Sequence, residues 1–140
     1  MPIVCILALD VGTKTIGVAR ARGAMAFPVT TLRRKSVRSD AEQLYQLCRK
    51  SKATAVVVGL PYELDGKEGR SARLARQIGT ALGERTGLPI HYQDERYSTV
   101  EASWRLSEQG LTSRQQRGII DQAAAAVILQ DWLDAQAAEE

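Results

Sequence analysis

Cysteine and histidine are scarce in this chain of 140 residues. The two cysteines, Cys5 and Cys48, have neither the spacing of a zinc site nor that of a redox pair, so we expect both to pack in the core. We expect the sole histidine, His91, to be packed or partly exposed rather than a general base. The two tryptophans, Trp104 and Trp132, occupy helical core positions, which favours packing over stacking on bases.

Long hydrophobic runs are also missing. No stretch is apolar enough to span a bilayer, so we expect no membrane partner. The first residues run straight into a predicted strand without the basic region or cleavage site of a signal peptide, which predicts a cytoplasmic protein. A chain of this length fits a single domain, spanning residues 1–140, that buries roughly two thirds of its unfolded surface without disulfides or a structural metal.

Positive charge is concentrated in the first part of the chain, although the net charge is only +3. Residues 1–60 hold ten Lys or Arg against three acids, and residues 61–140 hold nine against thirteen, so the two parts carry +7 and −4. A basic half favours a polyanionic partner such as nucleic acid. The densest basic segment is residues 33–38, for which a solvated loop is the alternative interpretation.

The beginning of the chain combines two apolar runs with a polar turn. The seven residues Ile3–Leu9 are apolar, Asp10 follows them, and a second apolar run covers Ile16–Ala19. This order predicts a buried strand that ends at a carboxylate and forms a hairpin with the next strand. Gly12 allows a sharp turn that brings the donors of residues 13–15 beside Asp10. Such a site could hold a metal ion and a phosphate, although an ordinary turn explains Asp10 considered alone.

The remaining pattern predicts an α/β fold. A capping box of Ser39 and Glu42 predicts a helix over residues 40–50. Further strands are predicted over residues 27–32, 53–60 and 90–93, and further helices before Gly87, after Ser98 and after Ser113, the last of which Gly118 could divide. We therefore expect one mixed five-stranded sheet, with its first three strands antiparallel, flanked by helices.

Acidic residues stand at the ends of these elements. Asp10 ends the first strand, Asp94 and Glu95 end the last strand, and Asp121 lies at or near a helix start. Ligands of α/β sheets collect at such strand ends. Carboxylates gathered at one point repel each other unless they bind a cation, and hard oxygen ligands suit Mg²⁺ or Mn²⁺. Metal ions held in this way can generate a hydroxide nucleophile for phosphodiester cleavage.

Asp121 has a second interpretation. An acid near a helix start is favoured by the helix dipole without any function. The small residues Ala124 and Ala125 follow on the same helix face, where they would let the helix lie close to the sheet and let the short Asp121 side chain reach inward. Helix charge complementarity does not explain why three acids converge.

These motifs resemble the YqgF/RuvX family of Holliday junction resolvase-like proteins with an RNase H-like fold. The resemblance spans almost the whole chain and is carried by residues 9–14 with 16–19, 58–61 with 65–66, 94–99, and 120–125. It implies a five-stranded mixed sheet, metal-dependent nuclease chemistry, and maturation of the 16S rRNA precursor at its 5′ end, with junction resolution as the older proposal. By position it implies that Asp10, Glu95 and Asp121 are the metal-binding catalytic acids. Asp94 could serve instead of Glu95, because strand alternation does not decide which side chain faces the site.

Basic residues complete the predicted site. The resemblance implies that Lys14 and Arg96 lie near the scissile phosphate. The loop over residues 62–70 also fits a phosphate-contacting role, since Lys67 and Arg70 supply charge and two glycines allow close backbone approach. An exposed turn is the alternative interpretation of this loop.

Two other functions also fit the sequence. The turn over residues 10–13 also resembles the phosphate-binding hairpin of sugar kinases and actin, but those proteins hold nucleotide between two related domains and this chain has one such segment. A non-catalytic RNA-binding factor for ribosome assembly would keep the acids as a structural metal site. The expected partners are structured RNA of a ribosome precursor or branched DNA, and the protein is expected to be a monomer or a homodimer.

Overall fold

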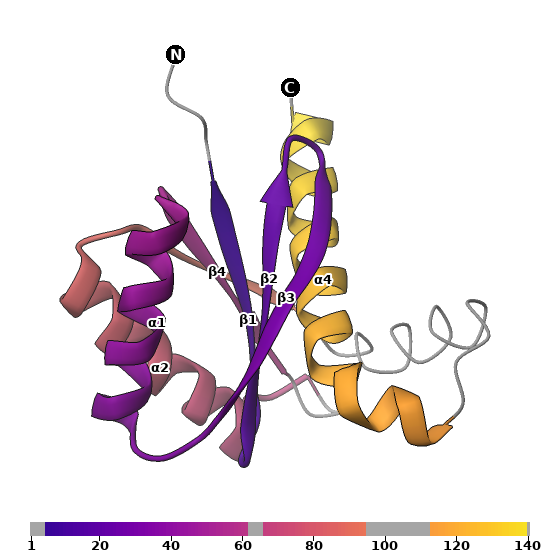
Figure 1. The fold of residues 1–140 in the computed structure, drawn as a ribbon. Coiled ribbons are helices and arrows are strands. Elements are labelled where there is room, and N and C mark those ends of the chain that lie inside the picture. Colours follow the sequence, from indigo (N-terminus) through magenta and orange to yellow (C-terminus); the bar gives the residue numbers. More distant parts are fainter. Residues whose placement is uncertain (1–4, 62–65, 95–112, 140) are drawn as a thin grey trace.

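The computed structural model describes residues 5–61, 66–94 and 113–139. In this part of the chain a central sheet lies between helices on both of its faces (Figure 1). The strands are β1 Ile6–Val11, β2 Thr15–Arg22, β3 Met25–Arg33, β4 Ala55–Leu60 and β5 Ile90–Asp94. The helices are α1 Val37–Ser51, α2 Arg70–Thr86 and α4 Ser113–Glu139.

The sheet has the strand order β3-β2-β1-β4-β5. β1, β2 and β3 pair antiparallel through two hairpins, whereas β4 is parallel to both β1 and β5. The predicted mixed sheet with three antiparallel strands at the start is therefore confirmed. Because β1 and β4 are parallel, the carboxyl ends of both strands lie at the same end of the sheet.

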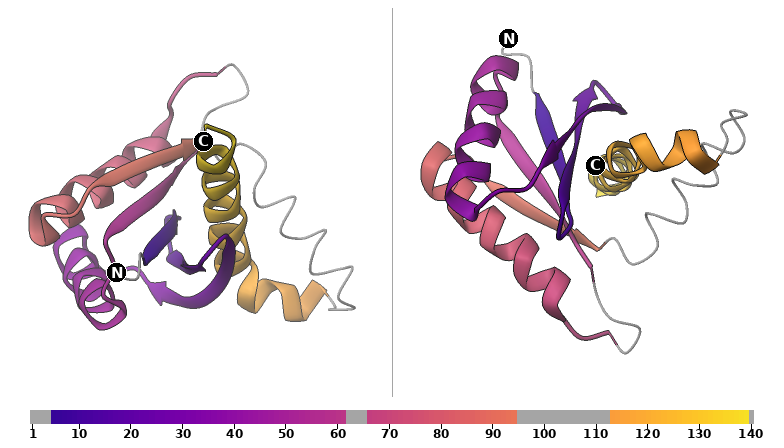
Figure 2. Two further views of the ribbon diagram at one scale, coloured as in Figure 1. Left: turned by 90° about the horizontal axis from the view of Figure 1, so that it is seen from above. Right: turned by 60° about the horizontal axis from the view of Figure 1, so that its bottom comes forward.

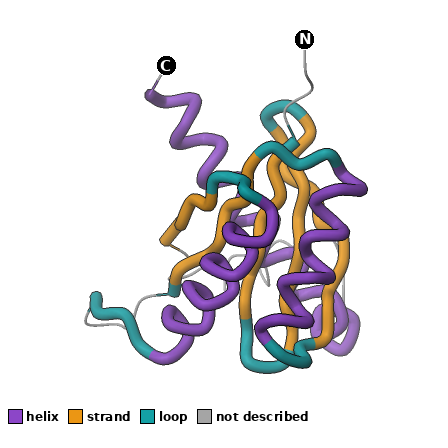
Figure 3. The backbone as a smooth tube through the Cα atoms, turned by 90° about the vertical axis from the view of Figure 1, so that its left-hand side faces the viewer, coloured by secondary structure: helices purple, strands orange, loops and turns teal. Residues whose placement is uncertain are grey.

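The two faces of the sheet pack against different helices (Figure 2). Leu7, Leu9 and Val11 of β1 face α1 and α2, which lie side by side over this face (Figure 3). Ile6 and Ala8, the residues that alternate with them, face α4 instead. Strands covered on both faces are apolar without alternation, which explains the uninterrupted hydrophobic run at the start of the chain.

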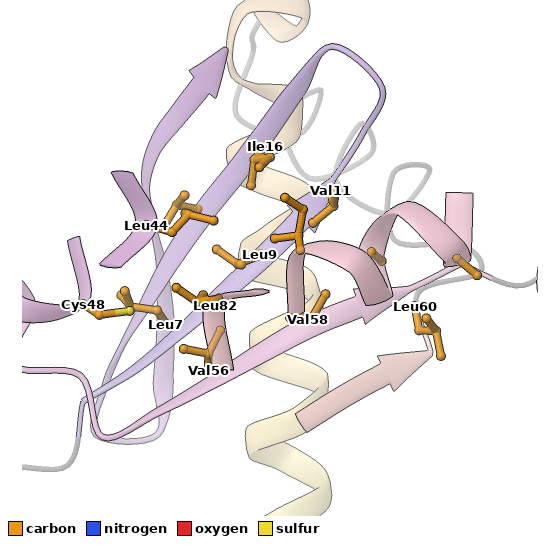
Figure 4. Packing of buried hydrophobic residues seen from close by; sticks show 14 residues of the cluster. Leu7, Leu9, Val11, Ile16, Leu44, Cys48, Val56, Val58, Leu60 and Leu82 are labelled. Atoms are coloured by element: carbon orange, nitrogen blue, oxygen red, sulfur yellow. The ribbon is translucent and has the colours of Figure 1, made fainter. Parts of the chain in front are cut away.

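Large aliphatic side chains fill the core on the α1 and α2 side (Figure 4). Leu44 of α1 and Leu82 of α2 meet Val56 and Val58 of β4 there, and all four are fully buried. Cys48 joins this core, where burial raises the pKa of its thiol to about 11. Cys5 is also buried and both thiols are free, which confirms that the cysteines pack in the core.

The start of α1 differs from the prediction. The helix begins at Val37, and the N-cap is Ser36, whose hydroxyl accepts a hydrogen bond from the Ser39 backbone N–H. The predicted capping box of Ser39 and Glu42 is therefore wrong. The physical reason is that Ser36 in an extended conformation already satisfies this donor three residues earlier, so that Ser39 lies within the first turn.

The last helix also differs from its prediction. α4 is a single helix from Ser113 to Glu139, so Gly118 does not divide it. One glycine costs a helix only about 1 kcal/mol, which is less than the packing of the following turns supplies. Asp121 lies eight positions after Ser113 and so is not at a helix start. It is therefore beyond the first turn, in which the helix dipole acts. The helix predicted after Ser98, with Trp104, lies outside the described residues.

No described helix combines the length and the apolar composition that a membrane span requires.

α4 approaches the sheet closely because both surfaces carry small residues. Ala125 on the helix is completely buried against the sheet, and β2 presents Gly17, Ala19 and Ala21 toward it. Ala124 is also completely buried, but among the described residues it clusters with Val127 of the same helix and not with the sheet. At the closest point no side chain fits between α4 and β2, because a Cβ atom on Gly17 would overlap the carbonyl group of Asp121. The predicted close approach of this helix to the sheet is confirmed.

Gly17→Ala is expected to lower the free energy of unfolding by about 1–3 kcal/mol, because the added methyl group must push α4 off β2. Urea denaturation measures this change. Gly83→Ala is the matched control, because its Cβ would meet only the Ile90 side chain, at 3.0 Å, and because alanine favours the helix. The control is expected to keep or raise stability, and equal stability of both variants would show that the α4 contact does not constrain Gly17.

Candidate active site

Asp10 lies within β1 rather than after it, as the penultimate residue of the strand. Alternation along the strand places its half-buried side chain on the same face as Ile6 and Ala8, which is the face covered by α4. Its partner in the neighbouring strand is Gly17. Because Gly17 has no side chain, the backbone of α4 can lie directly against this face of the sheet beside Asp10.

Asp121 lies on α4 directly over this point of the sheet. Its backbone contacts Gly17, the strand partner of Asp10. The hydroxyl of Thr15 donates a short hydrogen bond to Oδ2 of Asp121. The structure therefore brings Asp10 and Asp121 to the same face and the same end of the sheet, both half-buried, as the sequence predicted.

The predicted third acid is described only in part. Asp94 is the exposed last residue of β5, and alternation places it on the face that carries Ile90 and Tyr92, which pack against the α1 and α2 core. That is the face opposite to Asp10 and Asp121. Glu95 and Arg96 lie outside the described residues.

The turn between β1 and β2 carries the predicted phosphate ligand Lys14. The Gly12 N–H donates to the Thr15 carbonyl over 2.8 Å, which closes a tight turn at the lower end of the sheet in Figure 1. Lys14 is exposed on this turn. Thr15 was predicted as a donor beside Asp10, and the structure shows it bonded to Asp121.

Two residues near this turn, Arg34 and Asp40, were not predicted from the sequence. Arg34 donates to the Gly12 carbonyl over 3.1 Å and forms an ion pair with Asp40. Both belong to the stretch whose sequence predicts a basic segment followed by a capped helix. The available signal was an acid six positions after an arginine, too weak a pattern to indicate a buried pair.

Lys67 and Arg70 are exposed, on the loop after β4 and at the start of α2. Between them Glu68 forms an ion pair with Arg76 of α2, at 2.6 Å between Oε1 and Nε. The hydrogen bond from Arg76 lowers the pKa of the Glu68 carboxyl group. This pair ties residues 66–69 to α2, so Lys67 extends from an anchored segment at the end of the sheet where β4 ends.

His91 is exposed on β5, and its ring lies 5.2 Å from the ring of Trp132 on α4. Trp132 itself packs against the core on the α4 side of the sheet. The prediction that this tryptophan packs is confirmed. The contact between the two rings gives His91 a packing role.

The chemistry of the acidic site suits a hard divalent cation. Asp10 and Asp121 supply carboxylate oxygens, and both are only half-buried, so an ion between them would keep several of its waters, as Mg²⁺ does in proteins. Among the residues that the structure describes, no three acidic, histidine or cysteine side chains form a group that could hold a metal. The two acids fit such an ion and would need a further ligand.

A groove of about 950 Å³ lies between the start of α1 and the end of α2. Its lining includes Arg38, Glu42 and Arg85. α1 and α2 cover the opposite face of the sheet from α4, so the sheet separates this groove from Asp10 and Asp121. This groove is therefore separate from the acidic site.

Relatives of known name match most of this chain. A protein of Anaeromyxobacter sp. (strain Fw109-5), named "Putative pre-16S rRNA nuclease", is 44% identical over 130 residues, which cover 91% of this chain and 95% of that protein. A protein of Thermosynechococcus vestitus with the same name is 38% identical over 135 residues, covering 95% and 89% of the two chains.

Solved structures show the same fold. RuvC of T. thermophilus, in complex with a Holliday junction substrate, matches with a TM-score of 0.56 and 15% identity over 96% of both chains. This likeness establishes the RNase H-like fold that the resemblance implied. The family model described as "RuvX: Holliday junction resolvase" matches residues 4–135. The chain therefore belongs to the RuvX family.

Proposed function

We propose that this protein is a metal-dependent endonuclease that processes the 5′ end of the 16S rRNA precursor. The observation that carries the proposal is the meeting of Asp10 and Asp121 on one face of the sheet, through the Gly17 contact and the Thr15 hydrogen bond. The names of the relatives support the substrate, and the +7 charge of residues 1–60 supports a nucleic acid partner. We also propose that residues 1–140 form one domain.

In the proposed mechanism, Asp10, Glu95 and Asp121 would hold Mg²⁺ or Mn²⁺. When bound, the ion supplies a water of lowered pKa and stabilises the charge that develops on the phosphate. The Thr15 hydroxyl donates a hydrogen bond to Oδ2 of Asp121 and so limits the orientations of this carboxylate. Lys14, exposed on the adjacent turn, is placed to contact a phosphate of the substrate, and Arg96 is proposed for the same role.

Glu95 is preferred to Asp94 on geometric grounds. Asp94 lies on the α2 side of β5, away from Asp10. We therefore retain Glu95, the acid that the family resemblance implies, as the proposed third ligand.

Asp10→Asn and Asp121→Asn are each expected to abolish cleavage of a 5′-extended 16S rRNA precursor in Mn²⁺ while RNA binding persists. We expect a rate loss of about 100-fold or more, because changes to residues that only orient metal ligands already cost about 10–100-fold. Gel-based cleavage and filter binding measure the two effects, with a four-way DNA junction tested in parallel.

Asp134→Asn is the control, because it removes an exposed carboxylate from the same helix. Cleavage that survives in Asp10→Asn would contradict the proposal. Tight RNA binding without cleavage by the unmodified protein would favour the assembly-factor alternative, and cleavage of the junction alone would favour junction resolution, the activity that describes the family model.

Glu95→Gln and Asp94→Asn form a second test, in which each variant is the control for the other. Glu95→Gln is expected to lose cleavage as Asp10→Asn does, because it removes one of the three proposed ligands. Asp94→Asn is expected to cleave normally, since Asp94 lies on the other face of β5. The reverse result would assign the third ligand to Asp94.

Replacing both Lys67 and Arg70 with Ala is expected to weaken RNA binding and to flatten its salt dependence. Each lost phosphate contact reduces the slope of log affinity against log salt by about 0.7–0.9. Binding titrations at several salt concentrations measure this slope. Arg49→Ala/Lys50→Ala is the charge-matched control at the end of α1, where both residues are exposed. An equal change of slope in both variants would show that Lys67 and Arg70 do not belong to a specific binding surface.

A further inference from the structure

A buried ion pair joins the end of β3 to the first turn of α1. Arg34 Nε lies 3.1 Å from Oδ2 of Asp40, and their side chains are only 11% and 2% exposed. The other oxygen of Asp40 accepts the backbone N–H of Lys35 at 3.0 Å. Asp40 is the only charged residue among the buried side chains that the structure describes.

The same arginine reaches the turn between β1 and β2. Its Nη1 donates to the Gly12 carbonyl over 3.1 Å, and its backbone N–H donates to the Lys14 carbonyl over 2.9 Å. Two of the carbonyl groups of this turn are therefore held by one residue. Lysine could not replace it, because a single ammonium group lacks the planar fork that serves an acid and a carbonyl in fixed directions.

The turn held in this way ends at Thr15, whose hydroxyl donates to Asp121. α1 packs on one face of the sheet and α4 on the other. A chain of hydrogen bonds thus connects Asp40, through Arg34 and the turn, to Asp121. It links the two faces of the sheet. Each step is a hydrogen bond with a defined donor and acceptor.

The burial of this pair calls for a role other than stability. Removing two charges from water costs about as much as their attraction returns, so replacing a buried pair with apolar residues is often neutral for stability. A buried pair can instead fix a local geometry, because each partner is satisfied in only one arrangement. Here the group with the fixed geometry is the turn that carries Lys14 and Thr15.

We propose that Arg34 is a positioning residue: held by Asp40, it fixes the β1–β2 turn so that the Thr15 hydroxyl orients Asp121 for metal binding. This inference rests on the proposed function of the acidic site. It assigns Arg34 to the support of the site, although it belongs to the basic segment 33–38 that favoured a polyanionic partner. Its low exposure leaves little of its guanidinium for a phosphate.

The first test compares Thr15→Val with Thr15→Ser. Valine keeps the shape and loses the donor, so the dissociation constant for Mn²⁺, measured by isothermal titration calorimetry, is expected to rise about 10–100-fold. Serine keeps the donor and is expected to restore most of the affinity. Equal affinity of Thr15→Val and the unmodified protein would overturn the role of Thr15.

The second test replaces the pair with apolar residues, Arg34→Met together with Asp40→Leu, which avoids leaving one charge buried alone. Amide hydrogen exchange at Gly12 and Arg34 is expected to become faster, because the bonds that close the turn are no longer held. The Mn²⁺ dissociation constant is expected to rise, and kcat to fall, by about tenfold or more. The affinity for RNA is expected to stay unchanged.

The matched control is Arg85→Ala with Glu42→Ala, which removes an exposed pair from the same two-helix face. It is expected to leave exchange at Gly12, Mn²⁺ affinity and cleavage unchanged. A similar loss in the control would show a general effect of ion pairs and would overturn the inference, as would unchanged exchange and affinity in Arg34→Met/Asp40→Leu.

The unmodified protein separates the two ideas. If it binds Mn²⁺ and cleaves RNA while the variants match it, the positioning role fails and the proposed function stands. If it neither binds Mn²⁺ nor cleaves, the proposed function fails, and the inference that rests on it fails as well.

Discussion

The direct contact between α4 and β2 is the constraint on which the rest of this structure depends. Gly17 leaves no room for a side chain, so the backbone of Asp121 rests on the strand and its carboxylate reaches the sheet end where Asp10 lies. Alanines on both surfaces extend this close approach along the helix. Without it the short aspartate side chain would not reach the site, since α4 would lie farther from the sheet.

The two faces of the sheet have different tasks. The face under α1 and α2 carries large aliphatic side chains whose burial contributes hydrophobic stabilisation. The face under α4 carries small residues and, at its carboxyl end, the acids. Arg34 and Asp40 connect these two parts of the fold through the turn that both faces share.

Much of the fold was predictable because the signals were local. Apolar runs located the strands, the glycine at residue 87 located the end of α2, and the order of elements indicated a mixed sheet. The errors arose where two local signals compete. Ser36 and Ser39 both suit an N-cap, and the extended conformation of Ser36, whose hydroxyl accepts from the Ser39 N–H, places the helix start at Val37. Gly118 suggests a break that packing of the following turns overrides.

The sequence by itself determined which acidic residues are candidates for the site and therefore the class of chemistry, because Asp10 and Asp121 belong to motifs that can be recognised without coordinates. Only the tertiary structure decided that Asp121 lies well inside a helix, that Asp94 faces away from Asp10, and that Thr15 and Arg34 support the site. The physical reason is that these facts depend on strand register and on contacts between residues as far apart as Thr15 and Asp121. Neither the register nor such a distant contact leaves a local signal in the chain.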